Sequence, residues 1–265
     1  MLKAVEHIRR MRGGAQSHLM RCNDGFYYVV KFLNNPQHTR VLANELIGTA
    51  LASRLGLPTA PFAVVEVEHD LIHLTEELAV QVGGSRTPCL PGLQFGSRYP
   101  GDPAQTAVFD LLPDDLLAEI ENGEDFLGML VFDKWTCNTN GRQVIFFREQ
   151  GRSRYQGMMI DQGFCFNAGE WNFPDAPLRG LYMRQRAYQT VTGMDSFETW
   201  LSRLERKNML DALDEAAKQV PPAWYGFDVD ALYALLERLD RRRTRVREQL
   251  EFARDSSRQP FPNWR

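Results

Sequence analysis

The sequence contains few cysteines and no long apolar segment. Its four cysteines are scattered through 265 residues, with no CxxC pair and no neighbouring group of histidines: Cys22, Cys89, Cys137 and Cys165. This spacing gives no sign of a zinc site and is typical of a reduced cytoplasmic protein. No apolar run approaches the roughly 18–20 residues that cross a bilayer, and the first residues lack an apolar signal core. We therefore expect a cytoplasmic protein that does not bind membranes.

The sequence also lacks an excess of charge of either sign. Its 31 Lys and Arg nearly balance its 34 Asp and Glu, which leaves a formal net charge of −3. Because proteins that bind polyanions usually carry a basic surface, we expect no direct binding of nucleic acid. The basic residues at 241–247 are interpreted as a solvated helix face, with a polyanion site as the alternative. Hydrophobic residues make up 43% of the chain, enough to fill one large core or two small ones.

The first hundred residues alternate between strand-like segments and one helix-like segment. Alternating apolar residues and β-branched or aromatic runs indicate strands at 5–11, 18–22, 26–33 and 61–67. Apolar residues recur at helical spacing from 41 to 55, and Gly56 follows as a natural C-cap. The stretch from 83 to 103 is rich in glycine and proline, so we expect a loop there that marks a lobe boundary.

The rest of the chain is mostly helical. Helical patterns begin at Pro113 and cover 124–135, 196–205, 208–219 and 228–254, and a hairpin pattern covers 143–148 and 155–160. We expect an α+β fold of two lobes. Residues 1–100 form a small lobe with an antiparallel sheet and one helix, and residues 101–265 form a larger, mainly helical lobe with a hairpin.

Three features of the small lobe indicate a phosphate site. Gly13 and Gly14 lie between two strands, where backbone N–H groups could cradle phosphates, although a glycine pair is also an ordinary turn. Lys31 lies inside an apolar strand, where an ammonium needs a partner or a ligand unless it faces solvent. Glu45 interrupts the apolar surface of the following helix, so it either faces Lys31 or is solvated.

Two polar segments of the larger lobe complete the pattern. Asp133 lies on the last turn of the predicted helix at 124–135, which looks buried, and a polar loop with Asn138 and Asn140 follows it. The hairpin then leads to Asp161-Gln162-Gly163, where a carboxylate at a strand end could hold a metal against phosphate oxygens or only cap a turn. The order of glycine turn, strand lysine, helix glutamate, polar loop and Asp-x-Gly is that of proteins that transfer phosphoryl groups.

Over residues 10–175 the sequence resembles the HipA-like kinases, whose fold is related to that of the phosphoinositide kinases. The resemblance rests on Gly13-Gly14-Ala15-Gln16, the strand around Lys31, Asn44-Glu45, Leu55-Gly56-Leu57-Pro58 and Ile160-Asp161-Gln162-Gly163. It implies a kinase-like fold that binds ATP and Mg²⁺.

The resemblance also implies roles for individual residues. The turn from Gly13 through Gly14, Ala15 and Gln16 to Ser17 becomes the phosphate loop. Lys31 contacts the nucleotide phosphates, Glu45 orients Lys31, and Asp161 binds Mg²⁺. The segment around Gln94 lies near the adenine.

The catalytic loop departs from the pattern of these kinases. In the most natural register Asn140 stands where the catalytic Asp belongs and Ile145 where a metal-binding Asn belongs. Asn cannot accept a proton as a carboxylate does, and Ile cannot bind a metal. In a second register Asp133 supplies the base and Asn138, five residues on, the metal ligand. Gln143 could replace the missing Asn as a ligand, and both registers stay possible.

The resulting hypothesis is an ATP-dependent phosphotransferase that acts on a protein Ser/Thr or on a small-molecule hydroxyl. The alternatives are a pseudokinase, which binds nucleotide or a protein without transfer, and a structural partner that has lost nucleotide binding too. The segment 167–174 follows the Asp-x-Gly motif, and its Trp171 and Phe173 either contact substrate or pack onto the helical lobe.

Overall fold

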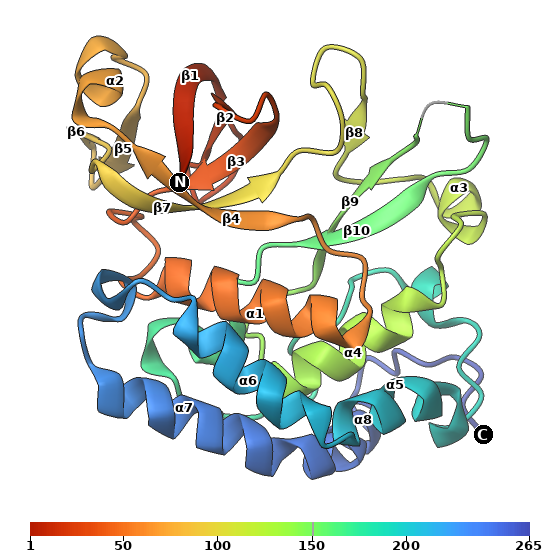
Figure 1. Ribbon diagram of the computed structural model, residues 1–265. Helices are drawn as coiled ribbons and strands as arrows, with labels where there is room; N and C mark the ends of the chain where they lie inside the picture. The colour runs from red at the N-terminus through yellow and green to blue at the C-terminus, as the bar shows by residue number, and fades with distance from the viewer. Residues whose placement is uncertain (150) are drawn as a thin grey trace.

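The computed structural model describes residues 1–149 and 151–265, and it has a sheet-rich part above a helical part (Figure 1). Five strands close into a barrel in the order β1-β2-β3-β7-β4, with bounds β1 (Leu2–Arg10), β2 (His18–Cys22), β3 (Tyr27–Lys31), β4 (Phe62–Val67) and β7 (Gly92–Arg98). The pairs along the barrel are antiparallel except for β1 with β4, which pair in parallel at Leu2–Val65 and Lys3–Glu66. The predicted α+β fold with a sheet-containing N-lobe is confirmed. The closure of the sheet into a barrel was not predicted.

The prediction of a loop from 83 to 103 is wrong. This stretch contains β6 (Ser85–Pro88), which pairs with β5 (Ala79–Val82), and β7, which lies between β3 and β4. Packing explains why β7 has a glycine at position 96, because a Cβ there would lie 2.6 Å from Cγ2 of Val65 on β4. The glycine therefore permits a close approach within the barrel and does not form a turn.

Helix α1 (Val41–Leu55) lies beneath the barrel and packs on both parts of the molecule (Figure 1). It matches the predicted helix, and Gly56 caps it in the left-handed conformation with φ +84°. Most of its side chains are buried in the large core shared with α4 (Asp125–Thr136) and the helices that follow. The division of the chain at residue 100 stays a prediction.

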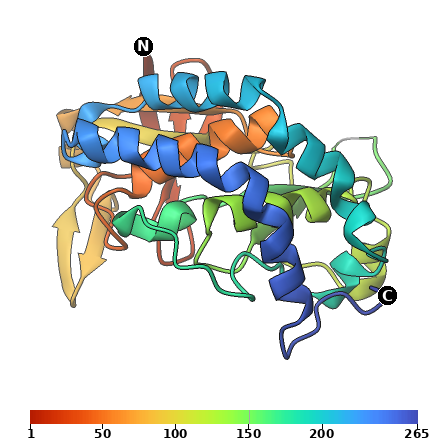
Figure 2. The ribbon, with the colours of Figure 1, turned by 90° about the horizontal axis from the view of Figure 1, so that it is seen from below.

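The helical part is built around α4, whose residues from Phe126 to Thr136 are all buried. The other helices are α2 (His69–Leu74), α3 (Asp114–Ala118), α5 (Glu198–Glu205), α6 (Asn208–Lys218), α7 (Val229–Arg242) and α8 (Val246–Arg254). The predicted helix at 228–254 is in fact two, because a 3₁₀ turn at Arg243–Arg245 bends the chain between α7 and α8 (Figure 2). The predicted hairpin is present as β9 (Gln143–Phe147) and β10 (Gln156–Ile160), with β8 (Val108–Phe109) beside β9.

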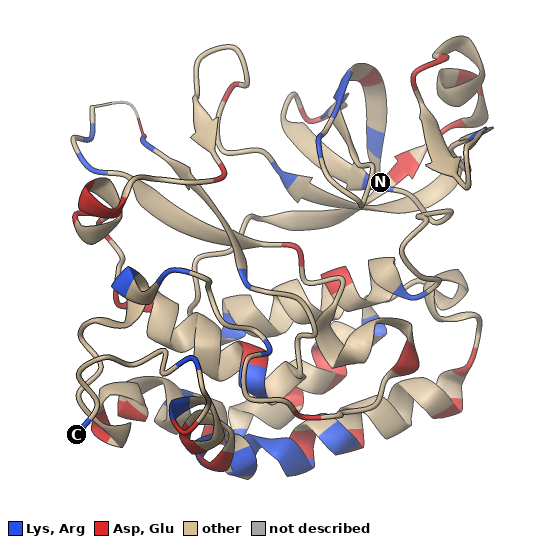
Figure 3. Ribbon diagram, turned by 180° about the vertical axis from the view of Figure 1, so that it is seen from behind, with Lys and Arg blue, Asp and Glu red and all other residues tan. Residues whose placement is uncertain are grey.

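The basic run at 241–247 lies on a surface of mixed charge (Figure 3). Arg241, Arg245 and Arg247 each pair with a glutamate, at distances from 2.9 to 3.2 Å. Arg242 instead turns inward, where it binds Asp175 and donates to the backbone oxygens of Lys134 and Trp135. These pairs agree with the interpretation of a solvated helix face.

None of the helices among the described residues is both long and apolar enough to cross a membrane.

The packing of α5 on α4 makes a prediction about stability. A Cβ added at Gly128 would lie 2.4 Å from the ring of Trp200, whereas one at Gly123 would find its nearest neighbour at 3.8 Å. Gly128→Ala is therefore expected to lower the free energy of unfolding by about 1–3 kcal/mol through overpacking. Gly123→Ala serves as the control and should leave it nearly unchanged. Urea denaturation measures both, and equal stability of the two variants would contradict this account of the packing.

Candidate active site

Lys31 at the end of β3 is the centre of a buried charge cluster. Its ammonium group contacts Glu45 of α1 and lies 2.5 Å from Oδ1 of Asp161, which directly follows β10. The predicted pairing of Lys31 with Glu45 is confirmed, and Asp161 is a second partner. Residues from three separate segments therefore meet where the barrel joins the helical part.

Glu45 also fixes the Asp-x-Gly turn. Its carboxylate accepts backbone N–H groups from Gln162 at 3.1 Å and from Gly163 at 2.9 Å. Glycines on both sides permit this approach, since a Cβ at Gly48 would lie 2.7 Å from Cβ of Gln162, and one at Gly163 would lie 2.8 Å from Cγ2 of Val41. Asp161 itself has φ +63°, a left-handed conformation that costs energy in a residue other than glycine. The turn is thus held by α1 against local backbone strain.

The cluster has one positive and two negative groups in a buried place. Burial alone would lower the pKa of Lys31, but Glu45 and Asp161 outweigh it and raise that pKa above its usual value. Burial would raise the pKa of Asp161, yet Lys31 outweighs it and holds that pKa below its usual value. Burial, together with the charge of Asp161, raises the pKa of Glu45. When all three groups are charged, the cluster carries one net negative charge, which favours a bound cation.

The glycine turn is anchored on two sides. Asn35 donates to the backbone oxygen of Ala15 at 2.9 Å, and the side chain of Gln16 exchanges hydrogen bonds with the backbone of Gln81 on β5. The side-chain amide of Gln16 is thus occupied within the protein. Gly13 has φ +111°, which only glycine adopts readily, and nothing lies within 4 Å of the place of its missing Cβ.

Ser17 and Gln94 are both buried. The backbone oxygen of Ser17 accepts from Met11, and His18 beside it pairs with Val30, so the glycine turn ends next to Lys31. Gln94 accepts from the backbone of Leu33 and donates to that of Leu90. The side chain of Gln94 is therefore used inside the barrel region, and its place near adenine stays a prediction.

Asp133 is fully buried at the end of α4. Arg142 donates to both of its carboxylate oxygens, with Nε 2.8 Å from Oδ2, and Asn138 donates to Oδ1 at 2.9 Å. Gly180 covers Asp133 so closely that a Cβ there would lie 2.2 Å from its Cβ. The two residues of the second register do meet, but they bind one another inside the protein.

Asn140, in the loop after α4, and Gln143, at the end of that loop, are both exposed. Asn140 accepts through Oδ1 from the N–H of Gly141 at 2.9 Å. Gln143, at the start of β9, donates to Oδ2 of Asp161 at 2.7 Å. Ile145 lies two residues further along β9, opposite Met158. The structure thus brings Gln143, and not the residue at position 145, to Asp161.

Sequence reasoning gave no role to Arg142 or to the side chain of Asn44. Arg142 also donates to the backbone oxygen of Ile160 at 2.8 Å and to the amide oxygen of Gln162 at 2.7 Å, so it joins the Asp133 loop to the Asp-x-Gly turn. Asn44 donates to the backbone oxygens of Gly163 and Cys165 and accepts from the indole of Trp171. The signals for Asn44 were its polar side chain on a helix that looks buried and its place beside Glu45 in the resemblance.

Trp171 is buried, and the guanidinium of Arg40 lies 4.2 Å from the centre of its ring. Phe173 is partly buried against the large core. Of the two interpretations of this segment, packing onto the helical part agrees with the positions of both rings.

A glycine turn, a strand lysine, a helix glutamate and an Asp-x-Gly turn on this fold define a protein of the kinase-like class. The sequence matches the HipA-like kinases over residues 4–256, and the chain belongs to that family. The predicted family is thereby confirmed. A sequence comparison with curated proteins gives no match.

Solved structures share the fold at low sequence identity. The Golgi casein kinase has a TM-score of 0.57 at 12% identity over 96% of this chain and 74% of that one, and it is also known with Mn/ADP bound. The Helicobacter pylori proinflammatory kinase CtkA has a TM-score of 0.53 at 15% identity over 91% and 94%. HipA of Shewanella oneidensis MR-1, in complex with HipB and operator DNA, has a TM-score of 0.55 at 14% identity over 94% and 68%.

The ion pair of Asp133 with Arg142 leads to a second prediction. Asp133→Ala leaves a buried guanidinium without its carboxylate, so the free energy of unfolding is expected to fall by roughly 3–5 kcal/mol. The double variant Asp133→Leu/Arg142→Met removes both charges and should recover part of that loss. Urea denaturation of the two variants checks this. A loss below about 1 kcal/mol for Asp133→Ala would show that the pair does not hold the loop.

Proposed function

We propose that this protein binds ATP with Mg²⁺ and transfers its terminal phosphoryl group to a hydroxyl. The observation that carries the proposal is the contact of Lys31 with both Glu45 and Asp161 beside an anchored glycine turn. Two carboxylates hold the ammonium group in one position and keep it positively charged. A group that binds phosphate oxygens needs both properties. The chain also belongs to a family of kinases, which supports this role for the cluster.

The residues at Asp161 fit a magnesium ion. Asp161 supplies hard carboxylate oxygens, and the amide nitrogen of Gln143 donates to one of them, which places this amide beside Asp161. The cluster of Lys31, Glu45 and Asp161 carries one net negative charge. Mg²⁺ usually takes one or two carboxylates and completes its shell with phosphate oxygens and water. Asp161, through its carboxylate, and Gln143, through its amide oxygen, would hold the ion. The side chain of Asn138 is buried and donates to Asp133 instead. When bound, Mg²⁺ neutralises charge on the phosphate oxygens.

The acceptor in this proposal is the hydroxyl of a protein Ser/Thr or of a small molecule. The likeness in fold to a casein kinase supports a protein acceptor. A cytoplasmic location is part of the proposal and is supported by the four cysteines, all of which are free and buried. That the chain does not bind nucleic acid directly stays a prediction, although a HipA of the same fold is known in a complex that contains operator DNA.

Nucleotide titrations test the binding site. Asp161→Asn should weaken binding of Mg-ADP by at least about tenfold more than binding of ADP without metal, because it removes the charged ligand of the ion. Lys31→Met keeps the aliphatic stem and should weaken both. Isothermal titration calorimetry with and without Mg²⁺ measures these effects, and circular dichroism controls for folding. Unchanged ADP affinity in Lys31→Met would refute the site.

A pseudokinase is the second candidate, and the catalytic loop favours it. In the first register Asn140 occupies the position of the base, and the Asp133 of the second register is enclosed by Arg142, Asn138 and Gly180. A missing general base typically costs about 10²–10⁴-fold in rate. Phosphoryl transfer depends mostly on positioning and charge stabilisation, so the loss slows the reaction without abolishing it.

Restoring the carboxylate distinguishes the two candidates. Asn140→Asp is expected to raise transfer of label from γ-labelled ATP by about 10²-fold, because the aspartate can accept the proton of the acceptor. The double variant Asn140→Asp/Asp161→Asn is the control and should lose this gain. Measurable wild-type transfer that disappears in Asp161→Asn supports the phosphotransferase. If neither wild type nor Asn140→Asp transfers label while Mg-ADP still binds, the pseudokinase is the right description.

A further inference from the structure

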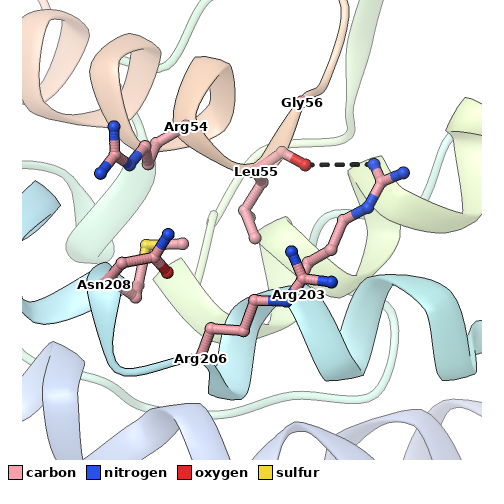
Figure 4. A pocket seen from close by; sticks show the side chains of 7 residues that line it. Arg54, Leu55, Gly56, Arg203, Arg206 and Asn208 are labelled. Atoms are coloured by element: carbon pink, nitrogen blue, oxygen red, sulfur yellow. Dashed lines mark hydrogen bonds between the residues drawn. The ribbon is translucent and has the colours of Figure 1, made fainter.

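A cavity of about 400 Å³ lies at the C-terminal end of α1, where this helix meets α5 and α6 (Figure 4). Its lining includes Arg54 of α1, Arg203 of α5, Arg206 directly after α5, and Asn208 at the start of α6. Figure 4 shows the guanidinium groups of Arg203 and Arg206 on one side of Leu55. The guanidinium group of Arg54 and the amide of Asn208 lie on the other side. Glu45 lies ten residues before Leu55 on α1, about 15 Å along the helix, so this cavity is separate from the proposed nucleotide site.

The lining of the cavity contains three arginines and no carboxylate. Arg203 donates to the backbone oxygen of Leu55 at 3.3 Å and lies over the ring of Trp200. Over the described ranges 1–149 and 151–265, the side chains of Arg54 and Arg206 have neither a hydrogen bond nor an ion pair. This contrasts with Arg241, Arg245 and Arg247, each of which has a glutamate partner. The positive charge of the cavity is thus left uncompensated by the protein.

A structural role accounts for only part of this cluster. Cations near the C-terminus of a helix are favourable, which explains Arg54 in the last turn of α1 and the contact of Arg203 with Leu55. Arg206 makes no such contact, and it adds like charge beside Arg203. Asn208 begins α6, so the positive end of that helix dipole also faces the region. Both contributions stabilise an anion and destabilise the cavity when it is empty.

We propose that this cavity binds a small anion that bears phosphate groups. Guanidinium groups bind phosphate oxygens in pairs of parallel hydrogen bonds, and three of them around one cavity favour a ligand with more than one negative charge. The volume falls within the range of about 300–1,000 Å³ that small-molecule sites occupy. The source of the phosphate is either an inorganic phosphate chain or an organic phosphate ester.

Calorimetric titration with pyrophosphate and with glycerol 3-phosphate tests the proposal and distinguishes these sources. The titrations use Lys31→Met protein, so that binding at the nucleotide site does not contribute. Saturable binding of either probe is expected, and Arg206→Gln should weaken it by about tenfold or more. Arg241→Gln, which removes one exposed arginine from a glutamate pair, is the matched control and should bind as the parent does. The absence of saturable binding for both probes, or equal affinity in Arg206→Gln, would overturn the proposal.

Thermal unfolding distinguishes an anion site from a purely structural cluster. In a phosphate-free buffer of low salt, Arg206→Gln relieves repulsion among like charges, so its Tm should equal or exceed that of wild type. Added pyrophosphate should raise the Tm of wild type by more than that of Arg206→Gln, because the nucleotide site is the same in both and only wild type keeps all three arginines of the cavity. Sodium chloride at matched ionic strength is the control. A lower Tm for Arg206→Gln in the phosphate-free buffer would contradict the proposal. ADP binding should be the same in Arg206→Gln as in wild type, so the nucleotide site is tested separately.

Discussion

The contact of Lys31 with Glu45 and Asp161 joins three parts of the molecule that are far apart in the sequence: the barrel, helix α1 and the turn after β10. Taking charged groups out of water is costly, and the cost is recovered only if each charge has its partners in good geometry. Here Glu45 binds Lys31 and two backbone N–H groups at once. A change in the position of α1 would therefore unpair buried groups in the barrel and in the turn, so the three segments keep one arrangement.

A second buried ion pair, between Arg142 and Asp133, organises the loop that follows α4. Arg142 connects Asp133 at the end of α4 with Ile160 and Gln162 beside the metal-site candidate Asp161. Gly180 allows the chain to cover this pair closely, which leaves Asp133 fully buried. The exposed side of the loop then presents Asn140 and Gln143. An amide cannot accept a proton as a carboxylate does, so binding and transfer must be measured separately.

Helix α1 connects the two sites that the structure indicates. Glu45 in its middle contacts Lys31 and the Asp-x-Gly turn, and its last turn forms one wall of the arginine-lined cavity. Its glycine at position 48 allows the turn to approach, and Asn44 holds the segment that follows. Most of its side chains are buried, which agrees with a helix that contacts the barrel and the helical part at once.

The local elements and the charged residues that need partners could be predicted from the sequence. Apolar spacing placed α1 and most other helices, and Lys31 in an apolar strand with Glu45 on the next helix predicted their pairing, because isolated buried charges are unfavourable. Tertiary structure decided the rest. Strand β7 was missed because the close approach of Gly96 to Val65 is a contact between distant segments. In the same way, Arg142 and Gly180 enclose Asp133, while Asn140 is exposed. Spacing along the chain is a local property, whereas burial arises from contacts between distant segments, so two registers that looked alike in sequence differ in exposure once the chain is folded.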